Sequence, residues 1–345
     1  MKLKPIDQQT IVITGGTSGI GLATARRAAE EGAQVVLVAR DEEALDNVCS
    51  EIRADGGRAD YVAADVGVRE EVRHVVDTVV DRFGGFDTWV NDAGVGAYAK
   101  LEEISDEDHH RLFQTNYWGV VHGSTEALKH LRERGGALIN IGSISSEMPA
   151  PILSAYTASK FAVKGFTDSL RLELMHDKAP VSVTLIKPSG IHTPFGDHAE
   201  NYMDAASRVP PPVYAPEIVA DAILHAAENP TRSVLVGGAG RAMTLFARLA
   251  PRLSDRLYAF AFFKTARDPK RQKRNSEGLH GPGSYGHVYG DQSGYLRKVS
   301  LYTAMQTRPW RTAAVGLAFG LAGVFLSGLL TKPKMLEGAS PHPAR

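Results

Sequence analysis

The fold is decided by the stretch TIVITGGTSGIG, residues 10–21. Thr10–Thr14 is a short run of β-branched residues, typical of a buried strand, and a helical pattern begins at Gly19. Glycines between a strand and a helix let the backbone approach a phosphate closely, and the helix N-terminus favours its negative charge. The stretch therefore predicts a dinucleotide-binding turn at the start of an α/β fold.

The first 240 residues alternate apolar, strand-like runs with longer helical patterns. Several runs are continuously apolar, as expected for strands that are covered on both faces. The alternation predicts a Rossmann-type, doubly wound parallel sheet of about seven strands in three α/β/α layers, followed by a mainly helical C-terminal tail. The expected strands cover residues 10–14, 34–39, 60–63, 88–91, 137–141, 181–187 and 233–236, and the expected helices cover residues 19–31, 42–55, 69–83, 106–133, 155–177 and 216–228.

A second pattern combines Ser143 with Tyr156 and Lys160. A helix places side chains four positions apart on one face, so Tyr156 and Lys160 should lie together. An ammonium beside a phenol favours the phenolate, and we expect the pKa of Tyr156 to fall from its usual value near ~10. Such a tyrosine exchanges a proton with a substrate oxygen near neutral pH. Beside a bound hydride carrier, this predicts carbonyl reduction or alcohol oxidation.

The end of the second expected strand indicates which dinucleotide binds. An acidic residue there would hold the ribose hydroxyls of NAD, but the strand ends at Ala39 and is followed by Arg40. Because a guanidinium can pair with a 2′-phosphate, the sequence favours NADP(H) over NAD(H). The alternative is that Arg40 is a solvated charge whose effect Asp41 weakens.

Together these residues resemble the classical short-chain dehydrogenase/reductase family over about residues 8–240. The resemblance rests on Thr-Gly-x-x-x-Gly-x-Gly at residues 14–21, on Tyr-x-x-x-Lys, and on a serine 13 positions before the tyrosine. Other family landmarks follow in order. Asp65 lies in Ala-Asp-Val, Asn116 matches the helix asparagine of the catalytic tetrad, residues 91–94 read Asn-Asp-Ala-Gly instead of Asn-Asn-Ala-Gly, and residues 188–193 resemble the Pro-Gly segment with Ser189 in place of its glycine.

The resemblance implies the roles of the site residues. NADPH would deliver hydride to a carbonyl carbon while Tyr156 donates the proton, and Lys160 would hold the nicotinamide ribose. Ser143 would hydrogen-bond the substrate oxygen, and Asn116 would position a water that links Lys160 to solvent. The implied catalytic residues are Asn116, Ser143, Tyr156 and Lys160. The implied cofactor-binding residues are Thr14, Gly15, Thr17, Ser18, Gly19, Ile20, Gly21, Arg40, Asp65, Val66, Asn91, Ala93, Gly94, Tyr156, Lys160, Pro188, Gly190, Ile191 and Thr193.

Charge is distributed unevenly along the chain. The formal net charge is zero, but residues 1–240 carry 22 Lys+Arg against 34 Asp+Glu, and residues 241–345 carry 17 against 5. A basic tail on an acidic body suggests contact with a negative surface. The one cysteine, Cys49, cannot form an internal disulfide and should be a buried thiol. No Cys/His cluster has metal-ligand spacing, and we expect neither a metal nor a nucleic-acid partner.

We divide the chain into five regions. Residues 1–240 form the catalytic domain, residues 241–274 a basic amphipathic extension, residues 275–311 a Gly-rich linker, residues 312–330 a transmembrane helix, and residues 331–345 a tail. The span from 312 to 330 has no charged residue and, at ~1.5 Å per residue, measures about 28 Å as a helix. Basic residues precede it in excess, which places the catalytic domain on the cytoplasmic side of a membrane.

Three further expectations concern substrate and partners. Residues 193–215 follow a strand end and should cover the substrate, the alternative being an ordinary surface loop. Contact of the tail with membrane lipid suggests a lipophilic carbonyl or alcohol as substrate. Alternatively, the protein is a soluble NAD(H)-dependent dehydrogenase whose tail packs in a homo-oligomer, or an NADP-binding membrane scaffold without redox turnover.

Overall fold

The structure is a computed structural model that describes residues 1–268, 270–273, 278–283 and 285–307. One compact unit spans Met1–Thr303, and a second begins at Ala304. The first unit extends well beyond residue 240, so the described part of the extension up to Thr303 packs with the catalytic core.

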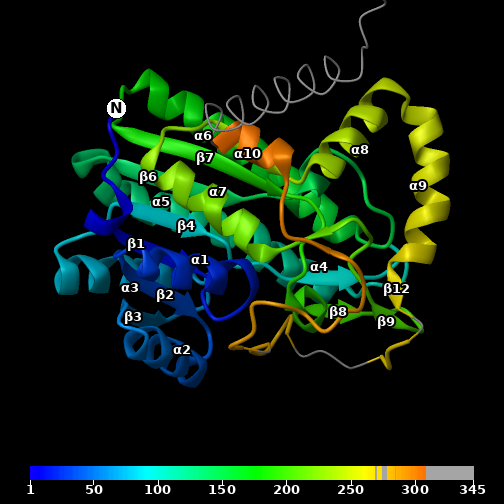
Figure 1. Cartoon of the computed structure of the whole chain (residues 1–345), viewed down its shortest axis with the longest axis horizontal. Coiled ribbons are helices and arrows are strands. Elements are labelled where there is room, and N and C mark those ends of the chain that lie inside the picture. The colour runs from blue at the N-terminus through cyan, green and yellow to red at the C-terminus, as the bar shows by residue number, and fades with distance from the viewer. Residues whose placement is uncertain (269, 274–277, 284, 308–345) are drawn as a thin grey trace, which may run out of the picture. The chain divides into compact units, whose positions relative to one another are not determined.

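A seven-stranded sheet, all parallel, forms the centre of this unit, in the order β11-β7-β6-β4-β1-β2-β3 (Figure 1). The fold is the predicted doubly wound one, and each strand lies within two residues of its expected bounds. The strands are β1 (Thr10–Thr14), β2 (Gln34–Ala39), β3 (Arg58–Ala63), β4 (Thr88–Asn91), β6 (Gly136–Ile141), β7 (Val181–Pro188) and β11 (Ser233–Val236). Shorter strands pair outside this sheet, namely β5 (Gly96–Tyr98) with β8 (Ala199–Asn201), β9 (Ala206–Ser207) with β12 (Arg267–Asp268), and β10 (Val213–Tyr214) with β13 (Leu296–Arg297).

Helices cover both faces of the central sheet and bury separate apolar cores. One core joins alternate strand residues such as Ile11 and Ile13 to α1 (Gly19–Glu30), α2 (Glu42–Ala54) and α7 (Pro216–Glu228). The other joins Val12 and Val36 to α3 (Arg69–Phe83), α5 (Gly119–Arg134) and α6 (Ser154–His176). Because successive strand residues point to opposite faces, this division confirms the three-layer arrangement. The remaining helical segments are η1 (Ile6–Gln8), α4 (Asp106–Phe113), η2 (Gln114–Trp118), η3 (Ile144–Ser146), η4 (Pro194–His198), α8 (Gly238–Leu249), α9 (Pro251–Thr265) and α10 (Leu301–Thr307).

The helix expected over residues 106–133 is interrupted. It begins as α4, where the Ser105 side chain accepts a hydrogen bond from Asp108 N at 3.1 Å. It then passes through η2, a π-helical turn, before it continues as α5. Such turns are common at functional sites, and this one contains Asn116.

The basic extension folds as two helices. Pro251 occupies the first turn of α9, and α8 ends at Leu249. The two helices pack together through Tyr258, whose hydroxyl donates to Met243 O at 2.9 Å and whose ring meets Phe246 at 6.3 Å between centroids. In Figure 1 they run side by side in yellow, far from α2 and β3.

The expected transmembrane helix, residues 312–330, lies outside the described residues. Within the part of the chain that the structure describes, no helix combines the length and apolar character needed to cross a bilayer.

Two helix glycines make a matched test of this packing. A Cβ on Gly123 of α5 would lie 2.0 Å from Asn91 Oδ1, whereas a Cβ on Gly165 of α6 would meet no atom within 4 Å. Gly165→Ala should stabilise the protein by about 0.5–1 kcal/mol, because alanine loses less backbone entropy on folding. Gly123→Ala should destabilise it by about 1–3 kcal/mol through overpacking. Chemical denaturation measures both, and equal changes would contradict the close packing at Gly123.

Candidate active site

A cavity of about 510 Å³ lies at the carboxyl ends of the central strands. It is bounded by the Gly-rich turn after β1, the ends of β2, β4, β6 and β7, and the start of α6. Most of the cofactor residues expected from the sequence line it, namely Gly15, Thr17, Ser18, Gly19, Ile20, Arg40, Asp65, Val66, Ala93, Gly94, Tyr156, Lys160, Pro188, Gly190, Ile191 and Thr193.

The Gly-rich turn has no room for side chains. Gly15 has a φ of +73°, and a Cβ there would lie 2.9 Å from Ala93 Cα. A Cβ on Gly21 would lie 2.2 Å from Gly15 O. Thr14 fastens this turn to the end of β4, because its Oγ1 accepts hydrogen bonds from Asp92 N at 3.1 Å and Ala93 N at 3.2 Å. Thr14 and Gly21 thus shape the dinucleotide turn from outside the cavity.

Arg40 and Asp65 form the far end of the cavity. Asp65 accepts hydrogen bonds from Arg111 Nη2 at 2.6 Å and from Gly67 N at 2.8 Å. The Arg40 guanidinium donates to main-chain carbonyls of residues 278–281, in the C-terminal extension. Burial is the main cause that lowers the pKa of Arg40, and the neighbouring Arg111 lowers it further.

Ser143, Tyr156 and Lys160 come together at the opposite end, as the spacing predicts. Lys160 Nζ donates to Ile141 O at 2.9 Å and lies 5.7 Å from the centroid of the Tyr156 ring. Ser143 follows β6 and caps η3, and its side chain forms a hydrogen bond with Tyr156. The three side chains reach the cavity from two elements, the β6–η3 turn and the first turns of α6.

The pKa of Tyr156 differs from the expectation. Burial raises it to about 12, although the hydrogen bond with Ser143 acts in the opposite direction. The spacing of four residues predicted only the neighbouring ammonium and could not predict how strongly burial disfavours a phenolate. At neutral pH the tyrosine in this structure is therefore a protonated phenol, the form that donates a proton to a carbonyl oxygen.

Asp92 is the site residue that the sequence analysis left without a role. Burial raises its pKa to about 7, while Lys160 and a hydrogen bond from the Gly21 backbone lower it. Burial also lowers the pKa of Lys160 to about 8, and the negative charge of Asp92 opposes that shift. Asp92 therefore helps to keep the buried Lys160 charged. Its position in Asn-Asp-Ala-Gly was the signal that could have indicated this.

The two asparagines have structural partners. Asn116 is fully buried and joined to Val95, with its Oδ1 accepting from Val95 N at 2.8 Å and its Nδ2 donating to Val95 O at 2.9 Å. Asn91 donates to Asn140 Oδ1 at 2.8 Å and accepts from Trp89 Nε1 at 2.8 Å. Neither side chain lines the cavity, and the water-positioning role of Asn116 stays a prediction.

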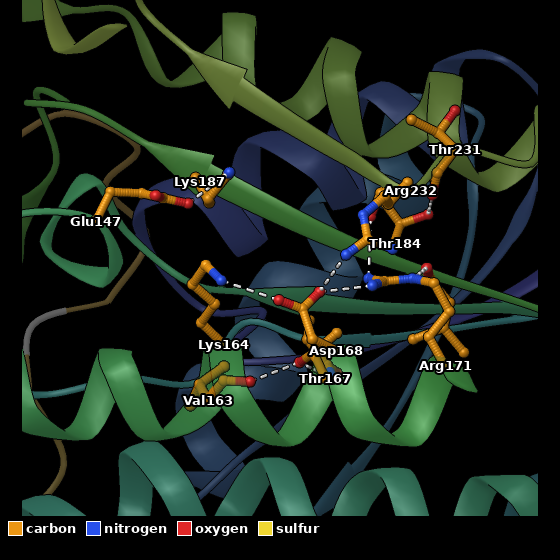
Figure 2. A network of polar contacts seen from close by, with 12 residues as sticks. Glu147, Val163, Lys164, Thr167, Asp168, Arg171, Thr184, Lys187, Thr231 and Arg232 are labelled. Carbon is orange, nitrogen blue, oxygen red and sulfur yellow. Dashed lines mark hydrogen bonds and ion pairs between the residues drawn. The ribbon is translucent and has the colours of Figure 1, made fainter. Parts of the chain in front are cut away.

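The helix that carries Tyr156 and Lys160 is fastened at its far half (Figure 2). Asp168 of α6 accepts hydrogen bonds from Arg171 at 2.6 Å, Lys164 at 2.9 Å and Arg232 at 3.3 Å. Arg171 also donates to Val183 O of β7 at 3.0 Å. These contacts tie α6 to β7 and to the segment before β11, so the start of α6 stays in register with the strand ends.

The extension supplies cavity residues that no local sequence pattern indicated. Met243 of α8, several side chains of α9, and residues of the following segment line the cavity. They reach it only because the chain folds back after residue 240. These residues are Met243, Leu257, Tyr258, Ala261, Phe262, Thr265, Pro282, Gly283 and Tyr285. Residues 193–215, expected to cover the substrate, line it through Thr193, Pro194, Phe195, His198, Val209, Pro210, Pro211 and Pro212.

This arrangement fits a nicotinamide dinucleotide. Gly15 and Gly19 bring the bare backbone of the turn to the cavity wall, and the N-terminus of α1 suits a pyrophosphate. When bound, the dinucleotide supplies or accepts a hydride. In such a reaction Tyr156 would donate a proton to the substrate oxygen in reduction and regain it in oxidation, and the Ser143 hydroxyl would stabilise charge on that oxygen.

Fold and site together define an NAD(P)-dependent oxidoreductase that acts on CH–OH or C=O groups. Residues 9–203 match the short chain dehydrogenase family, and the chain belongs to it. It is 44% identical over 320 residues to the uncharacterized oxidoreductase YxnA of Bacillus subtilis, covering 91% of this chain and 90% of that one.

Two solved structures show the same fold. A short chain dehydrogenase/reductase from Burkholderia phymatum in complex with NAD is 25% identical, with a TM-score of 0.66 over 79% of this chain and 100% of that one. A gluconate 5-dehydrogenase from Burkholderia cenocepacia in complex with NADP and tartrate is 27% identical, with a TM-score of 0.60 over 69% of this chain and 97% of that one.

The pairing of Asp92 with Lys160 predicts a pH effect. Reductase activity should fall as the pH rises through about 8, because Lys160 then loses its charge. Asp92→Asn removes the negative charge that raises the pKa of Lys160, so the fall should move to lower pH. The pH profile of kcat/KM measures this shift. Asp41→Asn, at the N-cap of α2, is the control and should not move the profile. An unmoved profile in Asp92→Asn would contradict the coupling.

Proposed function

We propose that the protein uses NADP(H) in preference to NAD(H) to interconvert a lipophilic carbonyl and its secondary alcohol, with Tyr156 as the general acid and base. One observation carries the proposal. The same cavity has a guanidinium, Arg40, at the end of β2, and an apolar wall from α8 and α9 beside Tyr156. Arg40 favours NADP(H) over NAD(H), and the apolar wall favours a lipophilic substrate.

The electrostatics at the end of β2 support NADP(H). Arg40 is a cavity residue, so a solvated charge is a poor description of it. The Asp41 carboxylate accepts a hydrogen bond from Ala44 N at 3.0 Å as the cap of α2. Because that carboxylate is engaged at the helix start, it does not replace the acidic residue that would favour NAD.

The composition of the other end supports a lipophilic substrate. Apart from the catalytic groups, the wall near Tyr156 is made mostly of aliphatic and aromatic side chains. A polar substrate would lose its hydrogen bonds to water there without replacing them, whereas an apolar one would gain from burial. The residues that form this wall are Met148, Ala150, Leu153, Phe195, Val209, Met243, Leu257, Ala261 and Phe262.

The outer face of α8 and α9 supports association with anionic lipid. Leu249, Leu253 and Phe260 are 74%, 59% and 76% exposed. Exposed arginines flank them, at positions 241 and 248 on α8 and 252 and 256 on α9. Exposed apolar groups bordered by cations are the pattern of a helix that lies in a membrane interface. On this basis we propose that the catalytic unit works at a membrane surface, and the excess of basic residues before residue 312 favours the cytoplasmic face.

Turnover tests the oxidoreductase proposal. Purified full-length protein with a panel of lipophilic ketones and aldehydes should consume NADPH faster than NADH. Tyr156→Phe should lower kcat by about 10²–10⁴-fold, because the proton donor is lost. Tyr61→Phe, on β3 outside the cavity, is the matched control. Tight NADPH binding without turnover in either reaction direction would favour the scaffold alternative.

The lipid contact is tested by labelling. Leu249→Cys and Phe260→Cys are each labelled with a polarity-sensitive fluorophore in the full chain. The native Cys49 should not react, because it is buried and its pKa is raised to about 12. Anionic vesicles should blue-shift both labels, and lipid-borne quenchers should reach them.

Labels at Leu172→Cys and Met175→Cys, exposed positions on α6, are the controls and should not respond. Vesicle binding with unchanged spectra at positions 249 and 260 would contradict insertion of this face. A blue shift that depends on protein concentration without lipid would indicate self-association instead.

A further inference from the structure

Residues 278–283, here called the strap, contact Arg40 and line the cavity through Pro282 and Gly283. They follow β11, the last strand of the central sheet, by about forty residues. The Arg40 side chain donates through Nη2 to Gly278 O at 2.9 Å and through Nη1 to His280 O at 3.0 Å. It also donates to the carbonyls of Leu279 and Gly281. A guanidinium has five N–H donors, so most of the binding capacity of Arg40 is directed to the strap.

Two side chains anchor the strap independently of Arg40. Leu279 has no exposed surface and packs with Val95, Leu112 and Ala155. His280 Nε2 lies 2.6 Å from Asp108 Oδ1, at the start of α4. The main chain is held as well, because Arg111 Nε donates to Leu279 O at 3.2 Å. A segment with a buried leucine and several polar contacts is part of the folded unit.

The strap continues toward the pyrophosphate end of the site. Pro282 and Gly283 line the cavity, and beyond them Gly286 N donates to Thr17 O at 2.9 Å. Gly19 N, at the N-terminus of α1, donates to His287 O at 3.0 Å. The cavity of about 510 Å³ is present with these contacts in place, so the strap bounds the site without filling it.

We infer that the strap is a cofactor-retaining element: it forms the outer wall over the adenosine half of the bound dinucleotide and, clasped by Arg40, must open before the dinucleotide is released. Arg40 then has two roles, as the cation beside a 2′-phosphate and as the clasp of the strap. The inference rests on dinucleotide binding, which the proposed function also requires, but on neither the substrate nor the preference for NADP(H).

The two roles of Arg40 can be distinguished with NADH, a cofactor that has no 2′-phosphate. Full-length protein is loaded with NADH or NADPH, mixed rapidly with excess oxidised dinucleotide, and the loss of nicotinamide fluorescence gives the dissociation rate. Arg40→Ala should accelerate NADH release by about tenfold, because the strap opens more readily. A residue that only binds the phosphate would leave NADH release unchanged.

Leu279→Ala and His280→Ala should also accelerate release of both dinucleotides, because each removes an anchor of the strap. Leu131→Ala, equally buried but on α5 and outside the cavity, is the matched control and should lower thermal stability without changing the release rate. The inference would be overturned if Arg40→Ala released NADH, and both anchor variants released either dinucleotide, at rates within twofold of the unsubstituted protein. If the variants accelerate release as predicted but the protein shows no turnover, the result counts against the proposed function and not against the strap.

Discussion

A charged lysine held away from water is the constraint on which the site depends. Lys160 is 4% exposed, and burial alone would favour its neutral form. The carbonyl of Ile141 accepts a hydrogen bond from it, and the nearby Asp92 carboxylate opposes the effect of burial. These groups come from the ends of β6 and β4, whereas Lys160 is on α6. The ammonium is therefore maintained only while this helix keeps its register against the two strands.

The C-terminal extension adds to the central fold the residues that close both ends of the cavity. Its helices α8 and α9 add an apolar wall beside Tyr156, and the strap adds a wall beside Arg40. Both ends of the cavity thus depend on residues beyond 240. The compact unit accordingly runs to Thr303, and the regions predicted as a separate extension and linker line the cavity as far as Tyr285. The face of α9 that is turned away from the cavity carries exposed apolar and basic residues, which brings the proposed lipid contact close to the substrate end.

Local patterns in the sequence were sufficient to predict the sheet, the glycine turn and the proximity of Ser143, Tyr156 and Lys160. Continuously apolar runs predict strands that are buried on both faces of a sheet. A spacing of four residues on a helix is enough to place Tyr156 beside Lys160. The direction of the Tyr156 pKa shift could not be predicted, because it depends on burial by residues that are distant in sequence. The contact of Arg40 with His280 joins residues separated by 240 positions, and no local pattern encodes it. The π-helical turn at Asn116 has likewise no signal in the apolar spacing.

A crystal structure of the full chain with bound NADP(H) would test the central claim most directly, which is that the extension completes one continuous site from Arg40 to Tyr156. The account predicts the 2′-phosphate within hydrogen-bonding distance of Arg40, the nicotinamide beside Tyr156 and Lys160, and residues 278–283 in place over the adenosine. A dinucleotide bound with these residues displaced from the site, or with its phosphate far from Arg40, would contradict it.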